Sequence, residues 1–393
     1  MNGTHRNLVR VLLTMTVSFF VQSSVLASTE VERVVSDLKY FRFQPLNGAT
    51  APCAAFDCLL AWGTIAVALG DVGAYARRVG VSGMDEYARS IGVQQNFLLL
   101  KQLEVLPPAL PYHIATNFRI KIKNIAAIKA IGNDEASLAL DSRPIIEAKI
   151  NDLPMDAILD SGAALTIPAD SPAAKSLDVL PLQVSATSGT GSKQVANFST
   201  AKKVKVGDAE INNLMATLGP KIFVGSQQDA PIGLIGSDLL LRFDAVTVDL
   251  INGSVEFNPT RNPNKRCAPM EFVVDKNKML AGLAVMVNLA GVPMKARIDT
   301  GGNADIVLHG SRILANTEFH PTEIKFIDGS GNLETLEHGK ASITLGSETS
   351  MHNVLRTAAV HPDFDITLGA KFFFNRSFTF DFRHHEFCLN SSQ

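Results

Sequence analysis

The spacing of hydrophobic residues changes near residue 115. From about Asn117 onward, short runs alternate apolar and polar residues, as strands with one buried face do. Turn-forming pairs such as Asn252-Gly253 separate the runs. This pattern predicts a mainly β body. The runs are Phe118–Ile122, Ile145–Ile150, Val204–Val206, Val246–Val248, Ala284–Leu289, Ile343–Leu345 and Phe378–Phe380.

Residues 28–115 show a helical pattern instead. Acidic residues follow Thr29, which is typical of a helix start. Leu59–Gly70 and Val72–Val79 predict two helices broken at Gly70, and Gln94–Val105 continues the pattern. We interpret residues 28–115 as a helical extension packed on the β body. A removable propeptide over a cleft and a single helix-pair unit are the open alternatives, although one such unit cannot bury its own face.

The first 27 residues have the features of an export signal. Arg6 and Arg10 precede the apolar run Val11–Val21, which is too short to span a bilayer comfortably. Small residues up to Ala27 suit cleavage there. We expect residues 1–27 to be a signal peptide and the protein to be exported, periplasmic or secreted, with no stable membrane span after cleavage. An uncleaved anchor is the alternative.

The β body contains an internal duplication. An apolar strand runs into Asp160-Ser161-Gly162, and the same arrangement returns 139 positions later as Asp299-Thr300-Gly301. Further anchors follow in the same order in each copy, and the proline-containing stretch Asn258–Pro269 separates the copies. We therefore predict two equivalent halves, 116–260 and 266–393. The paired anchors are Gly189-Thr190-Gly191 with Gly329-Ser330-Gly331, Leu234-Ile235-Gly236 with Thr367-Leu368-Gly369, and Val246–Asp249 with Phe378–Asp381.

Composition and charge narrow the function classes. The 393 residues are 46% apolar, enough to bury more than one core, and the formal net charge of −2 does not indicate a nucleic-acid partner. No Gly-x-Ser-x-Gly motif or clustered His/Cys ligand set is present, so we expect no metal and no cofactor. The pair His384-His385 falls in a turn between the last two expected strands, and we interpret it as solvated.

Four cysteines in an exported chain suggest two disulfides, for which three pairings are open. Cys53 and Cys58 are close enough to close a small loop. Cys267 and Cys388 bracket the last third of the chain, and a bond between them would tie the end of the second half to its start.

The repeated Asp-Ser/Thr-Gly resembles the aspartic peptidases, of the retropepsin-like type with the pepsin-like pairing of two lobes in one chain. The resemblance covers roughly residues 117–390. It implies a mainly β fold of two pseudo-symmetric acid-protease-type lobes with a helical N-terminal extension. It also implies that Asp160 and Asp299 form a dyad that holds one water and shares one proton. Support for the dyad would come from Ser161, Gly162, Thr300 and Gly301, flaps from residues 189–191 and 329–331, and the second motif of each lobe from Gly236 and Gly369.

We therefore expect an exported aspartic endopeptidase that acts as a monomer, an internal pseudo-dimer, on peptide or protein substrates. The alternatives are a non-catalytic peptide-binding or scaffolding protein of the same fold, and two ordinary β-turns without a site. Ala163 and Gly302 stand where the pepsin-like branch often has a hydroxyl residue, Ser188 replaces an aromatic residue before the first flap, and Asn303 is unusual. Because a lost donor raises the pKa of the pair, we expect a less acidic optimum than that of a gastric-type enzyme.

Overall fold

The computed structural model describes most of the β body and parts of the N-terminal segment. It describes residues 32–34, 36–37, 39–40, 56–79, 103–130, 142–166, 171–187, 193–218, 232–261, 266–274, 280–314, 317–327 and 333–390. The predicted signal peptide, residues 1–27, lies outside this set. The prediction of a mainly β fold is confirmed.

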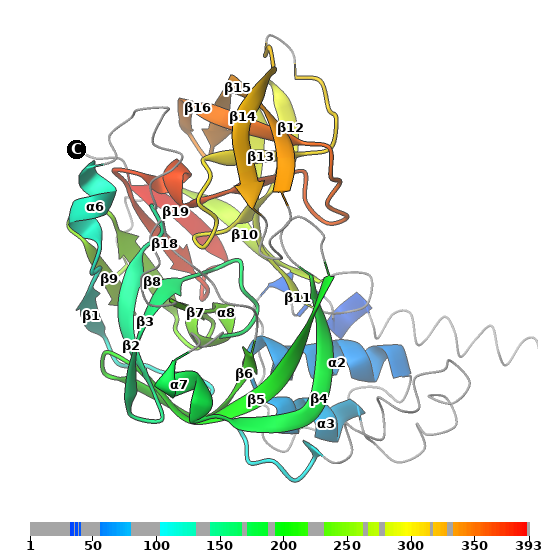
Figure 1. Ribbon diagram of the computed structural model, residues 1–393, viewed down its shortest axis with the longest axis vertical. Helices are drawn as coiled ribbons and strands as arrows, with labels where there is room; N and C mark the ends of the chain where they lie inside the picture. Colours follow the sequence, from blue (N-terminus) through cyan, green and yellow to red (C-terminus); the bar gives the residue numbers. More distant parts are fainter. Residues whose placement is uncertain are drawn as a thin grey trace, which may run out of the picture.

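The first half is built on a six-stranded sheet in the order β4-β5-β2-β3-β7, with β6 paired to β5 (Figure 1). Its central hairpin, β2–β3, leads to the first Asp turn, and β3 pairs in parallel with β7. The elements are β2 (Ile145–Ile150), β3 (Leu153–Leu159), α7 (Pro172–Lys175), β4 (Asp178–Thr187), β5 (Lys193–Val206), β6 (Ala209–Leu218), β7 (Gly233–Ile235) and α8 (Ser237–Leu240).

The second half repeats these connections. The hairpin β11–β12 leads to the second Asp turn, and β12 pairs in parallel with β17. The elements are β10 (Arg266–Val274), β11 (Leu280–Leu289), β12 (Val292–Ile298), β13 (Ile306–His309), β14 (His320–Ile327), β15 (Leu333–Leu345), β16 (Glu348–Thr357), β17 (Ile366–Leu368) and the 3-10 helix η2 (Ala370–Phe373).

A shared antiparallel segment joins the halves. It runs β1-β9-β8-β18-β19-β10 and continues into the strands of the second half, thirteen strands in all among the described residues. At the junction of β8 and β18, Thr247 pairs with Thr379, and their hydroxyl oxygens lie 2.7 Å apart. These threonines occupy equivalent places in the two copies, so the halves meet through the same residue on each side. The remaining elements are β1 (Phe118–Lys121), α6 (Ile125–Ala130), β8 (Ala245–Asp249), β9 (Ser254–Phe257), β18 (Ser377–Asp381) and β19 (Glu386–Asn390).

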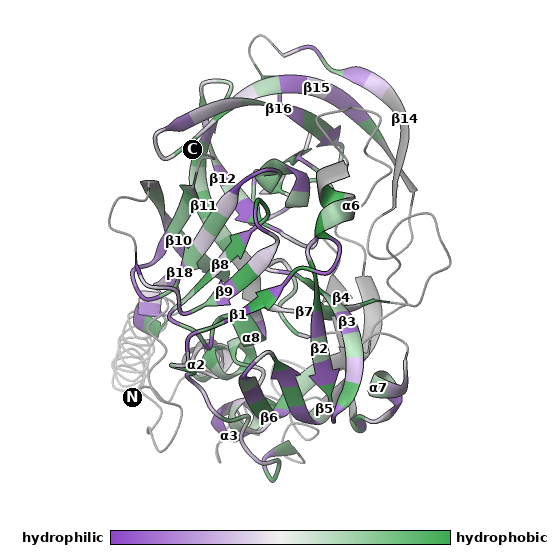
Figure 2. Cartoon of the chain, turned by 90° about the vertical axis from the view of Figure 1, so that its left-hand side faces the viewer, coloured by the Kyte–Doolittle hydropathy of each residue, from purple (hydrophilic) through white to green (hydrophobic). Residues whose placement is uncertain are grey.

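The alternating pattern of the sequence is visible on the strands. On β6, Ala209, Ile211 and Leu214 are buried while Glu210 and Asn212 are exposed, and Figure 2 shows the corresponding bands of hydropathy. The alternation shifts by one position after Asn212, where Asn213 has a φ of 58°. One face of the sheet therefore packs on the core, as the period-2 pattern predicts.

The N-terminal helices are packed into the core of the first half. α2 (Phe56–Ala68) and α3 (Val72–Val79) separate at Gly70, whose φ of 63° and whose contact with Leu214 require glycine. The predicted break at Gly70 is therefore present. Arg242 is fully buried, and its guanidinium donates to the carbonyl groups of Leu69, Ala109 and Pro111. Within the described residues, no helix combines the length and hydrophobicity needed to cross a membrane.

The disulfide predicted between Cys267 and Cys388 is confirmed, and it joins directly opposite residues of β10 and β19. Cys53 and the side chain of Cys58 lie outside the described residues, so their pairing stays a prediction. Residues 94–102 of the expected helical segment Gln94–Val105 also lie outside the described residues. The bounds 28–115, 116–260 and 266–393 stay predictions.

Candidate active site

Each half places one aspartate directly after a buried strand. β3 ends at Leu159 and β12 ends at Ile298, so Asp160 and Asp299 begin the turns that follow. The backbone N–H of Asp160 donates to the carbonyl of Ile235 at 2.9 Å, and that of Asp299 donates to Leu368 at 2.9 Å. The parallel neighbours β7 and β17 thereby fix where both turns start.

The glycines of the second motif allow these neighbours to pass beneath the Asp turns. A Cβ on Gly236 would lie 2.7 Å from the Leu165 carbonyl carbon, and one on Gly369 would lie 2.3 Å from the Ala304 oxygen. No larger residue fits at either place. Directly after Gly236, the N–H of Ser237 donates to the carbonyl of Ala163 at 2.8 Å. The equivalent bond in the second half runs from Ala370 to Gly302, at 2.7 Å.

Ser161 and Thr300 cross-link the two turns. The Ser161 N–H donates to Thr300 Oγ1 at 3.0 Å, and the Thr300 N–H donates to Ser161 Oγ at 3.2 Å. Each hydroxyl also donates across the boundary, Ser161 to the carbonyl of Ile298 at 3.0 Å and Thr300 to that of Leu159 at 2.5 Å. Both side chains are 1% exposed, so these bonds operate without competition from water.

The carboxyl groups of Asp160 and Asp299 lie against each other's turns. A Cβ on Gly162 would stand 2.4 Å from Asp299 Cγ, and one on Gly301 would stand 2.1 Å from Asp160 Cγ. The Gly162 N–H in turn donates to Asp160 Oδ1 at 2.8 Å. With ordinary bond lengths, these contacts limit the distance between Asp160 Oδ1 and Asp299 Cγ to at most about 8 Å. The two turns therefore bring both carboxyl groups into one site.

The environment of Asp160 favours its protonated form. The pKa of Asp160 is raised to about 7, mainly by burial and then by the nearby charge of Asp299. Arg297 and the backbone N–H groups of Gly162 and Ala163 oppose this shift, but burial is the largest effect. The site can therefore hold a proton on one carboxyl group at neutral pH.

In sequence, each predicted flap falls between two strands that pair with each other. β4 and β5 pair up to Thr187 and Lys193, and β14 and β15 pair up to Ile327 and Leu333. The connecting residues 188–192 and 328–332 lie outside the described set. The flap assignments therefore stay predictions. They comprise Gly189, Thr190, Gly191, Gly329, Ser330 and Gly331.

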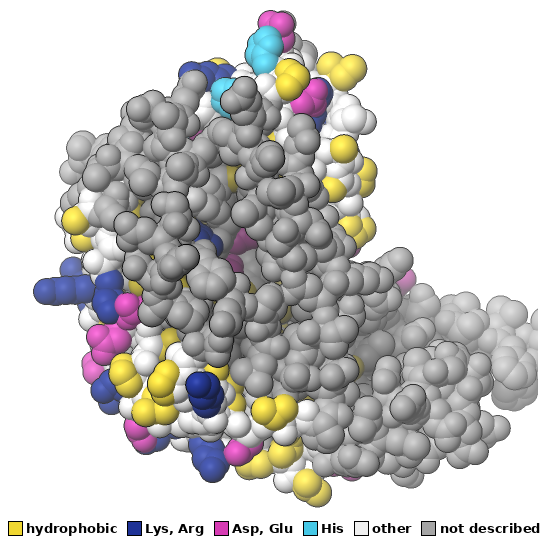
Figure 3. All heavy atoms as spheres, in the orientation of Figure 1, with side chains coloured by type: hydrophobic (Ala, Val, Ile, Leu, Met, Phe, Trp, Pro, Cys, Tyr) yellow, Lys and Arg dark blue, Asp and Glu magenta, His cyan; other side chains and the backbone are white. Residues whose placement is uncertain are grey.

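Sequence reasoning missed Arg297, whose guanidinium Nη1 is 3.8 Å from Asp299 Oδ2. The signal was available, because the equivalent residue in the first half is the fully buried Ile158. A charged side chain at a position where the other copy has a buried apolar residue indicates a role in the nearby site. In Figure 3 an acidic and a basic side chain are visible in a recess near the middle of the face shown.

Asn303 also has a defined place. Its Oδ1 accepts from both the N–H and the hydroxyl of Ser142 at 2.9 Å, which ties the second Asp turn to the first half. Gly302 stands beside Asp299, where a Cβ would meet the carboxyl carbon at an ordinary 3.5 Å. The residues that looked unusual in the sequence thus leave the cross-linked turns intact.

Among the described residues, one group has metal-ligand spacing: Cys267, Glu386 and Cys388. Its two cysteines form the disulfide and offer no thiolate, so the group does not fit a metal ion. The carboxylate of Asp381 accepts from the backbone N–H of His384 and lies 2.9 Å from its Nδ1, in the turn between β18 and β19. This contact gives His384 a structural role in its own turn.

Comparison with known families adds independent support. Residues 146–239 match the family model described as aspartyl protease. The matched segment contains Asp160-Ser161-Gly162 and the second motif of the first half. No curated protein matches the chain. The family match supports an aspartic protease family and a protease-type function for this protein.

Proposed function

We propose that this protein is an exported aspartic endopeptidase in which Asp160 and Asp299 together activate a water for attack on a peptide bond. The reciprocal approach of each carboxyl group to the other turn carries the proposal. The family match of the first half agrees with it.

The two carboxyl groups differ in surroundings and thus in role. Burial favours the protonated form of Asp160, whereas Asp299 has the guanidinium of Arg297 at 3.8 Å. In this scheme, ionised Asp299 takes a proton from the water as it attacks the peptide carbonyl. Protonated Asp160 donates a hydrogen bond to the oxyanion that develops. The reaction needs no covalent enzyme intermediate.

The substrate is an extended peptide or protein segment. Two hairpins, β4–β5 and β14–β15, arise from equivalent places in the two halves. The paired strands β4–β5 and β14–β15 both offer edges along which an extended chain can lie. Both halves belong to one chain, so a monomer holds both carboxyl groups. The predicted signal peptide and the disulfide favour a periplasmic or secreted location.

The test compares the wild type with Asp160→Asn and Asp299→Asn on an unfolded protein substrate. We expect each variant to lose about a thousandfold or more in kcat/KM, because neither acid nor base can be replaced by an amide. Asp156→Asn is the matched control, because Asp156 lies on β3 and is exposed. It should retain full activity, and circular dichroism should show that all variants are folded.

Two outcomes would reject the proposal. If the folded wild type cleaves no substrate across the acidic and neutral range, the non-catalytic peptide-binding alternative is favoured. If Asp160→Asn and Asp299→Asn cleave as fast as Asp156→Asn, the observed hydrolysis has another source.

A further inference from the structure

Arg297 occupies an unusual place for a cation. It lies on β12, two residues before Asp299, which begins the turn after that strand. Arg297 is only 9% exposed. Burial of a guanidinium is costly unless charge and hydrogen bonds compensate it. The contacts of this side chain therefore indicate what it does.

The guanidinium bridges the two Asp turns. Its Nη1 lies 3.8 Å from Asp299 Oδ2, and its Nη2 donates to the carbonyl of Gly162 in the turn that carries Asp160. Gly282 makes room on the neighbouring strand, where a Cβ would lie 3.2 Å from Arg297 Nε. Arg297 thus contacts the turn of Asp160 in the first half and the carboxylate of Asp299 in the second half.

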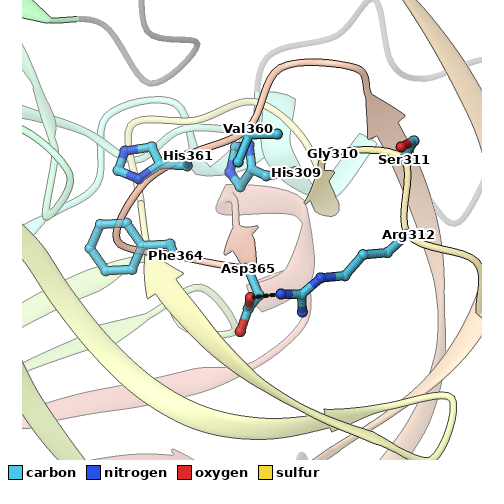
Figure 4. A pocket seen from close by; sticks show the side chains of 8 residues that line it. All are labelled: His309, Gly310, Ser311, Arg312, Val360, His361, Phe364 and Asp365. Atoms are coloured by element: carbon cyan, nitrogen blue, oxygen red, sulfur yellow. Dashed lines mark ion pairs between the residues drawn. The ribbon is translucent and has the colours of Figure 1, made fainter.

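The aromatic and histidine side chains near Arg297 carry no negative charge. Arg297 Cζ lies 5.9 Å from the ring of Phe364, which also lines a cavity of about 250 Å³ with His309 and His361 (Figure 4). Burial is the main cause that lowers the pKa of each of these histidines to about 4, and Arg297 adds to it. Both are therefore neutral above about pH 4.

The other charged groups on the packed elements are engaged elsewhere. Asp365, directly before β17, pairs with Arg312 at 2.7 Å and also accepts from the Lys295 N–H at 2.9 Å. Lys295, on β12, pairs with Glu271 at 2.5 Å. From the opposite turn, Asp160 faces the site. Among the described residues, the carboxylate paired with Arg297 is that of Asp299.

We propose that Arg297 is a positioning residue that holds Asp299 aligned against the Asp160 turn and, as a fixed positive charge beside the two carboxyl groups, sets the acidic edge of the working pH range. This inference rests on the proposed function for its effect on catalysis. A fixed positive charge beside a carboxylate keeps it ionised at lower pH. The pair then carries one proton, the active form, over a wider acidic range.

The experiment replaces Arg297 by methionine, which keeps the length and apolar stem, and by lysine, which keeps the charge. For Arg297→Met we expect the acidic limb of the kcat/KM profile to move up by about one to two pH units. Arg297→Lys should retain most of the wild-type profile. Arg312→Met is the matched control, because it removes a neighbouring cation that pairs with Asp365. Its acidic limb should stay in place.

A second readout does not depend on hydrolysis. Carbon-13 NMR of aspartate carboxyl carbons follows the titration of the pair in the folded protein. We expect Arg297→Met to raise the lower apparent pKa of the pair relative to wild type and Arg312→Met. Loss of dispersed signals would show that Arg297→Met is unfolded. In that case Arg297→Lys is compared with wild type, and we expect it to keep the wild-type titration of the pair.

The outcomes separate the two proposals. An inactive wild type would reject the proposed function, while the NMR titration would still decide the effect of Arg297 on the aspartates. Unchanged titration and an unchanged acidic limb in Arg297→Met would overturn the positioning role. A changed preference for acidic substrate side chains with an unchanged pH profile would also overturn it, since Arg297 would then bind a substrate carboxylate.

Discussion

Thr300 allows the cross-link between the two Asp turns to be measured. Its Oγ1 accepts from the Ser161 N–H at 3.0 Å and donates to the Leu159 carbonyl at 2.5 Å. Thr300→Val preserves shape but removes both bonds and leaves a buried N–H and a buried carbonyl without that partner. Each such group costs about 1–3 kcal/mol, so we expect a loss of about 2–6 kcal/mol in the free energy of unfolding.

Two further variants isolate the hydrogen bonds from other effects. Thr300→Ser keeps Oγ and should retain most of the stability. Thr344→Val makes the same chemical change at an exposed pair, where Thr344 Oγ1 lies 2.9 Å from Thr349 Oγ1. Because water can replace that partner, the cost there should stay within about 0.5 kcal/mol.

Urea unfolding followed by circular dichroism measures these differences. The midpoint for Thr300→Val should fall well below those of Thr300→Ser and Thr344→Val, while the slope stays similar. The reasoning would be refuted if Thr300→Val unfolded at the same urea concentration as wild type with an unchanged slope. The crossed bonds would then contribute no more than bonds to water do.

Three further predictions follow from the site and the second half. Gly301→Ala should abolish activity, because its Cβ would stand 2.1 Å from Asp160 Cγ. Gly302→Ala should be active, since the nearest contact of its Cβ is 3.5 Å. The kcat/KM values of the two variants test this prediction, and equal values would contradict it. Because the pKa of Asp160 is raised to about 7, the required proton is lost as pH rises. Activity should therefore decline through about pH 7 and should not peak in strongly acidic solution. Replacement of Cys267 and Cys388 by alanine should cost about 2–5 kcal/mol in urea unfolding, because the bond closes a long loop; wild-type stability of the double variant would argue against that contribution.

Much of the architecture was predictable because the chain contains the same pattern twice. Alternation identified strands such as Ile145–Ile150, and the repeated Asp-Ser/Thr-Gly indicated which turns are equivalent. The crossed bonds of Ser161 and Thr300 need only two equivalent turns placed face to face. A repeat predicts that symmetry directly, since equivalent sequences adopt equivalent local structure.

Contacts that are unique to one half could not be predicted in this way. The pairing of Asn303 with Ser142 spans 161 positions and has no counterpart in the periodic pattern. Arg242 is fully buried and bonds to carbonyl groups near residues 69 and 109–111. Hydrophobic spacing identifies which face of an element is buried, but it does not identify the partner of a buried polar group.

The position of Arg242 bears on whether the N-terminal helices are removable. The guanidinium of Arg242 donates to Leu69 at the end of α2 and to Ala109 and Pro111 beyond α3. Ala66 and Leu69 are buried in the same hydrophobic core as Leu214 of β6. Loss of residues 56–111 would leave a buried cation without these acceptors, which is strongly destabilising. This favours an integral extension of the first half over a propeptide.

The two halves carry different charged residues at equivalent positions near the aspartates, so Asp160 and Asp299 have distinct surroundings. Ile158 in the first half corresponds to Arg297 in the second, and the buried Asp238 corresponds to Lys371. Two identical halves would have to present the same surroundings to both carboxyl groups and could not favour the proton on one of them. A duplicated chain is free to diverge. The cation beside Asp299 and the burial of Asp160 therefore give the two carboxyl groups different surroundings before substrate binds.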